Sequence, residues 1–135
     1  MSQLILVEDD LDDIYFFKMA CDAVNPKLEV TVLHDGNELI EYIEQNNCIG
    51  KVILLDLNMP KMSGLEVLKK LNKSNMINQL IIITYTTSDH REDVKAAYEL
   101  GVNSYLTKPD NLEQLTQLVS SLSEYWFTFN LNLKE

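Results

Sequence analysis

The chain has 135 residues and a mass of 15.5 kDa, a size that fits one compact domain and leaves no room for a second folded module. Asp and Glu number 21 against 11 Lys and Arg, so the formal charge is −10, and such an acidic surface repels the phosphate backbone of nucleic acids. Because the amino terminus carries no signal-peptide pattern and no segment is apolar enough to span a membrane, we expect a cytoplasmic protein that binds neither nucleic acid nor membranes.

The first half of the chain alternates strand and helix patterns. Residues 4–7 form an aliphatic run that stops at acidic residues, and apolar residues then recur every three or four positions over residues 14–24. Residues 28–32 alternate apolar and polar side chains, as a half-buried strand does, and Asp35 is placed to cap a helix over the residues that follow it. These patterns predict two strand–helix pairs.

The second half continues the alternation three more times. Residues 52–55 and 80–83 are continuous aliphatic runs, as expected for central strands of a parallel sheet covered on both faces, and residues 102–107 form a fifth short run. Helices are expected over residues 65–71, after Ser63 and Gly64, over residues 89–100, with Asp89 as N-cap and Gly101 just beyond the end, and from near Asp110 to Leu122. Five strand–helix pairs imply a doubly wound α/β fold with helices on both faces of a parallel sheet.

Polar residues follow the predicted strands at the edge where ligands bind in open parallel sheets. These residues are Glu8, Asp9 and Asp10 after the first strand, Asp56 after the third, Thr86 and Thr87 at the end of the fourth, and Lys108 and Pro109 after the fifth. Clustered carboxylates favour the binding of a cation such as Mg²⁺, and an ammonium such as that of Lys108 suits a phosphoryl oxygen. Asp56 is therefore a candidate for an aspartyl phosphate, whereas Asp10, Asp12 and Asp13 are expected only to favour the first turn of a helix.

Four segments resemble the receiver domain of two-component response regulators, in order and in spacing, from about residue 3 to about residue 125. They are Val7–Asp10, Leu54–Gly64, Thr86 and Tyr105–Pro109. The resemblance implies a flavodoxin-like three-layer (βα)5 fold with strand order 2-1-3-4-5. It also implies a stand-alone receiver domain over residues 1–125, a C-terminal tail over residues 126–135, and no enzymatic activity beyond its own phosphorylation and dephosphorylation.

The same resemblance implies a role for each residue at this edge. Asp56 would accept a phosphoryl group from the phosphohistidine of a partner histidine kinase. Asp9 would bind Mg²⁺, or Mn²⁺ in its place, directly, and Glu8 would bind it through water. Asp56 would be the third acidic ligand, and the main-chain carbonyl of Asn58 would complete the protein ligands. Lys108 would contact the phosphoryl oxygens.

Thr86 and Tyr105 would form the switch. On phosphorylation the Thr86 hydroxyl would move toward the phosphoryl group and Tyr105 would turn inward, which alters the face formed by the last two helices and the last strand. Thr86 is chosen because it lies fifteen residues before Gly101, with Thr84 and Thr87 as the alternatives. The competing interpretation of Tyr105 is a packing aromatic on an edge strand.

The aromatic residues Tyr125, Trp126 and Phe127 follow the last predicted helix. A similar ending occurs in stand-alone receivers that partner phytochrome-type histidine kinases, so a kinase of that type is the expected partner. We expect Trp126 and Phe127 to cover the domain's own core. If they are exposed instead, they would indicate a homodimer contact.

Two other classes of function stay open. A metal-dependent phosphohydrolase would use an aspartyl nucleophile and a second carboxylate two residues later, where this chain has Asn58. A pseudo-receiver would share the fold and act only as a binding module. The remaining reactive residues are given structural roles: His34 and His90 are expected in solvated loops, and Cys21 and Cys48 as small buried thiols in a reducing compartment.

Overall fold

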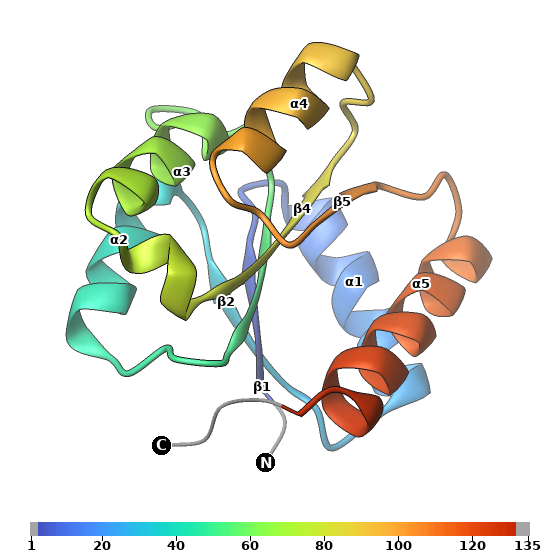
Figure 1. Ribbon diagram of the computed structural model, residues 1–135. Coiled ribbons are helices and arrows are strands. Elements are labelled where there is room, and N and C mark those ends of the chain that lie inside the picture. Colours follow the sequence, from blue (N-terminus) through green and yellow to red (C-terminus); the bar gives the residue numbers. More distant parts are fainter. Residues whose placement is uncertain (1–2, 132–135) are drawn as a thin grey trace.

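A computed structural model describes residues 3–131, which contain one sheet of five parallel strands. Figure 1 shows helices on both sides of this sheet. The strands are β1 (Gln3–Val7), β2 (Glu29–Leu33), β3 (Val52–Leu55), β4 (Ile81–Thr86) and β5 (Ser104–Thr107). The helices are α1 (Leu11–Val24), α2 (Gly36–Gln45), α3 (Gly64–Lys73), α4 (Arg91–Glu99) and α5 (Leu112–Glu124), with a 3-10 turn at Met76–Gln79 and a π-helical turn at Tyr125–Phe129. The strand order is β2-β1-β3-β4-β5, which confirms the predicted fold and topology.

Two apolar layers hold the sheet between the helices. Side chains alternate across each strand, so in β3 Ile53 packs on the side of α2, α3 and α4, whereas Leu54 packs on the side of α1 and α5. All four residues of β3 are buried, which explains why this central strand is continuously aliphatic. Both faces of the sheet are therefore used for packing, and the edge at the strand ends is where polar side chains gather.

The strand register brings the ends of β1 and β3 level with each other. Val7 at the end of β1 pairs with Leu55 at the end of β3. Asp56, the first residue after β3, donates its N–H to the Val7 carbonyl at 3.2 Å. Glu8, the first residue after β1, donates its N–H to the carbonyl of Leu33 at 2.9 Å. Glu8 and Asp56 are thus fixed by main-chain bonds at the same edge.

The helix boundaries follow local capping bonds. Ser63 caps α3 in a capping box with Glu66, and Gly101 lies beyond α4 with a φ of 108°, as predicted for a left-handed C-terminal residue. The prediction of Asp89 as the N-cap of α4 is wrong, because the first main-chain bonds of that helix go to the carbonyl of His90. The cap of α5 is Asn111, one residue beyond the predicted start.

The chain after α5 packs back onto the domain. Trp126 and Phe127 are half-buried against the layer formed with α1 and α5, as predicted, while Tyr125 and Phe129 are 56% and 67% exposed. The last residues of the predicted tail, 132–135, lie outside the described residues. Within residues 3–131, no helix has the length and apolar character needed to cross a membrane.

Candidate functional site

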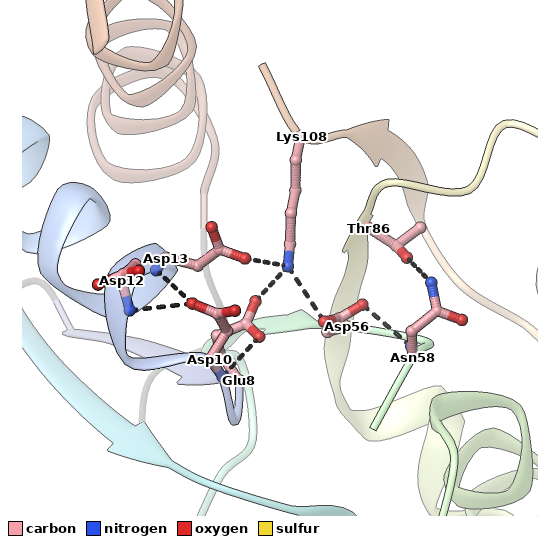
Figure 2. Close-up of polar contacts among 8 residues, drawn as sticks. All are labelled: Glu8, Asp10, Asp12, Asp13, Asp56, Asn58, Thr86 and Lys108. Atoms are coloured by element: carbon pink, nitrogen blue, oxygen red, sulfur yellow. Dashed lines mark hydrogen bonds and ion pairs between the residues drawn. The ribbon is translucent and has the colours of Figure 1, made fainter. Parts of the chain in front are cut away.

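Figure 2 shows the edge formed by the ends of β1, β3, β4 and β5, where Glu8, Asp56, Thr86 and Lys108 meet. The structure brings these predicted residues together from four separate strands. Asp56 and Glu8 are almost fully buried, at 4% and 1% exposure, so their charges can be offset only by groups that lie beside them. The chemistry of the edge therefore depends on their neighbours.

Glu8, Asp9 and Asp56 form an acidic group that fits a metal ion. One carboxylate oxygen from each lies within 4.8 Å of the others, and only Asp9 is exposed to solvent. Glu8 Oε1 is buried and receives no well-directed hydrogen bond, although the Lys108 Nζ lies 2.6 Å away. Hard divalent cations prefer carboxylate oxygens as ligands, and one oxygen of this group has no well-directed hydrogen bond of its own. The three residues therefore fit the predicted magnesium site.

Lys108 is the cation at the centre of the site. Its Nζ lies 2.6 Å from Glu8, 2.7 Å from Asp13 and 3.1 Å from Asp56, and 5.8 Å from the centre of the Tyr85 ring. Burial acts to lower the pKa of the Lys108 ammonium, but the close contacts with the Asp13 and Glu8 carboxylates and the charge of Asp56 outweigh it, so this pKa lies above its usual value. Lys108 is therefore a permanent positive charge that can face an incoming anion.

Asn58 links the candidate phosphoacceptor to Thr86. Its main-chain N–H donates to Asp56 Oδ1 at 3.0 Å, and its side-chain Nδ2 donates to the Thr86 hydroxyl at 3.3 Å. Of the two alternatives to Thr86, Thr84 donates its hydroxyl to the Ser104 carbonyl at 3.4 Å and Thr87 is exposed. Of these three threonines, Thr86 is therefore the one that hydrogen bonds link to Asp56, through Asn58. The metal-binding role of the Asn58 carbonyl stays a prediction.

Tyr105 lies on the edge strand β5, half-buried against the layer formed with α2, α3 and α4. Its hydroxyl donates to the Ser88 carbonyl at 2.9 Å, and partial burial raises the pKa of this phenol above its usual value. Tyr105 therefore packs against the domain and is also tied to the loop that follows Thr86. Both interpretations of this residue are compatible with that position, and its motion stays a prediction.

Asp13 is a site residue that sequence reasoning missed. Asp10 does cap α1, accepting the N–H groups of Asp12 and Asp13 at 2.9 and 3.0 Å, as expected for first-turn acids. The Asp13 side chain, however, reaches Lys108, so its assignment to helix capping alone is wrong. The available signal was its spacing: Asp13 lies four residues before the fully buried Phe17 and so on the inward side of α1.

The remaining reactive residues have the exposure predicted for them. His34 and His90 are exposed, and the described cysteines, Cys21 and Cys48, are buried and form no disulfide. Burial is the main cause that raises the pKa of the Cys21 thiol, to about 12, so this group is inert as a nucleophile.

Burial raises the pKa of Glu8 from 4.5 to about 7, which predicts a pH-dependent stability. Between these two pH values the folded chain holds a proton that the unfolded chain has lost, so raising the pH disfavours folding. The stabilising contribution of this proton is fully present below pH 4.5 and is lost as the pH rises to about 7. Urea unfolding of the metal-free protein across this range should show the loss, and Glu8→Gln should remove it. An equal loss in Glu8→Gln would assign it to another group.

Comparison with known proteins gives a consistent result. Residues 4–120 match the family model described as "Response regulator receiver domain". The response regulator Rcp1 of Synechocystis sp. is 34% identical over 128 residues, which cover 91% of this chain and 87% of Rcp1. The fold also matches the crystal structure of Mn²⁺-bound Rcp1 (30% identity, 99% and 100% of the two chains, TM-score 0.84) and that of the phosphorylated cyanobacterial phytochrome response regulator RcpA (32%, 98% and 99%, TM-score 0.86). With the fold, the edge residues and these matches in agreement, the chain belongs to the family of response regulator receiver domains.

Proposed function

We propose that this receiver domain accepts a phosphoryl group on Asp56 from the phosphohistidine of a histidine kinase, in a reaction that depends on Mg²⁺. The observation that carries the proposal is the setting of the Asp56 carboxylate. Oδ2 lies 3.1 Å from the Lys108 ammonium, Oδ1 accepts the Asn58 N–H at 3.0 Å, and two further acids are within reach of a shared cation. A buried carboxylate held in this way is oriented for nucleophilic attack.

The proposed transfer forms one bond and breaks one bond. A carboxylate oxygen of Asp56 bonds to phosphorus, the bond between phosphorus and the histidine nitrogen breaks, and the electron pair of that bond stays on the imidazole. A bound divalent cation would offset the negative charge of the carboxylates and of the phosphoryl oxygens. Lys108 supplies a second positive charge and already donates a hydrogen bond to Asp56.

The relatives support this proposal and suggest the kind of partner. Rcp1 has been crystallised with Mn²⁺ and RcpA in a phosphorylated form, and RcpA is a phytochrome response regulator. We extend this to the present chain as a phytochrome-type kinase partner. The proposal also places the chain in the cytoplasm, where thiols that form no disulfide, such as Cys21 and Cys48, stay reduced. The phosphohydrolase alternative gains no support, because the side-chain amide of Asn58 is too weak an acid to protonate a leaving group.

The metal dependence provides the direct test. Acetyl phosphate with Mg²⁺ should add the mass of one phosphoryl group to the intact chain, and excess chelator should prevent it. Asp9→Ala removes the exposed member of the acidic group, so at least about tenfold more Mg²⁺ should be needed for half-maximal labelling. Asp22→Ala, an exposed α1 acid outside that group, is the matched control. An unchanged Mg²⁺ requirement in Asp9→Ala would remove its role as a ligand.

The output surface is the last part of the proposal. Thr86 and Tyr105 would transmit phosphorylation to the face formed by α4, β5 and α5, for use in protein contacts or a phosphorelay.

The exposed Tyr125 and Phe129 at the end of α5 favour a homodimer through this end of the molecule. Light scattering should therefore give the mass of a dimer, and Phe129→Ser should shift it toward the monomer. A monomer at every protein concentration and phosphorylation state would refute the dimer.

A further inference from the structure

Asp13 holds a position that the proposed phosphorylation chemistry does not use. It contacts Lys108 at 2.7 Å, a shorter distance than the 3.1 Å between Lys108 and Asp56. Figure 2 shows the Lys108 ammonium between Asp13 on one side and Asp56 on the other. The ammonium donates hydrogen bonds to Asp13 and Asp56 and lies 2.6 Å from Glu8, so Asp13 and Asp56 share one cation.

Asp13 also stands outside the acidic group that fits a metal ion. That group contains Glu8, Asp9 and Asp56, so a dication bound there would contact those carboxylates and not Asp13. Asp13 and Asp56 contact the same nitrogen, which keeps their oxygens within about 6 Å of each other. In the phosphorylated protein, Lys108 would therefore be shared between Asp13 and the phosphoryl oxygens.

We propose that Asp13 competes with the phosphoryl group on Asp56 for the Lys108 ammonium and so weakens the binding of that group to the site. The inference rests on the proposed function. The alternative, that Asp13 is needed to hold Lys108 in place, is disfavoured because Glu8 contacts the same nitrogen at 2.6 Å and is itself fully buried. Lys108 keeps this partner when Asp13 is replaced. Asp13 is thus a positioning residue that limits the stability of the phosphorylated state.

Beryllofluoride tests the inference, because this anion binds a carboxylate oxygen with the shape and charge of a phosphoryl group. In calorimetric titrations with saturating Mg²⁺, Asp13→Asn should bind beryllofluoride about three- to tenfold more tightly than the wild-type chain. Asp12→Asn is the matched control: it removes the same charge from the same turn of α1 but from an exposed side chain, and should change the affinity less than about twofold.

The same substitution in a Lys108→Ala background separates competition from a general charge effect. Without Lys108, the partly exposed Asp13 carboxylate turns to water, so Asp13→Asn should then change the affinity less than about twofold.

Unchanged or weaker binding by Asp13→Asn, or an equal gain in either control, would overturn the inference. A purely structural role predicts weaker binding. If the wild-type chain binds no beryllofluoride, the proposed function fails as well, whereas binding without a gain in Asp13→Asn overturns this inference alone.

Discussion

Asp56→Asn should abolish the mass gain that acetyl phosphate and Mg²⁺ produce in the wild-type chain. The amide of Asn is neutral and cannot form the acyl phosphate, so labelling should fall to background rather than by a fraction. The fold should survive, because Asn has nearly the same shape and Lys108 keeps its contacts with Glu8 and Asp13. Intact-mass spectrometry measures the labelling, and the far-ultraviolet circular dichroism spectrum measures the fold.

A matched variant makes this result specific. Asp22→Asn removes the same charge from an exposed position on α1 and should be labelled like the wild-type chain. Hydroxylamine should release the label from the wild-type protein, as it does from acyl phosphates. Labelling of Asp56→Asn at the wild-type level would place the acceptor on another residue, and failure of both variants would point to a loss of structure.

The predictions made from the sequence agree best with the structure for residues that are buried in the sheet. The aliphatic runs of β3 and β4 could be predicted because a central strand covered on both faces has no solvent-facing side chain. The residues after those strands then follow by register, since Val7 and Leu55 end their strands at the same level. This is why Glu8 and Asp56 could be placed at one edge from the order of residues alone.

Predictions that depend on individual side-chain bonds were less accurate. Asp89 is as good a capping residue as Asp35. The Ser88 hydroxyl, however, donates to Asp93 at 2.6 Å and accepts the N–H of His90. The N-cap of α4 is therefore His90, one residue later than predicted. Asp13 is suited to the first turn of a helix by its charge, and only the packing of α1 against α5 brings it to Lys108, which lies just before α5. Such bonds depend on tertiary contacts that no local pattern encodes.

Gly64→Ala should damage both the stability and the site, because Gly64 lies where no side chain fits. A Cβ there would stand 2.5 Å from the Asp56 carbonyl oxygen and 2.7 Å from the Leu57 Cα, both main-chain atoms. Those atoms cannot withdraw easily, since the Asp56 N–H is bonded to Val7 and the Gly64 N–H to the Leu57 carbonyl at 3.0 Å. The free energy of unfolding should fall by about 1–3 kcal/mol, which urea unfolding measures.

The same clash should slow phosphorylation, because the main chain that must move is that of the acceptor itself. A displacement of Asp56 by a fraction of an ångström disturbs its contacts with Lys108 and Asn58, so labelling of the folded variant should slow by about tenfold or more. Gly36→Ala is the informative control. There the new Cβ would meet the side chains of Val67 and Met62, which can adjust without moving Asp56. If both variants lose stability and only Gly64→Ala loses labelling rate, the close approach of α3 to the acceptor strand is what positions Asp56. Equal labelling rates in folded Gly64→Ala and wild-type protein would show that the acceptor tolerates this displacement.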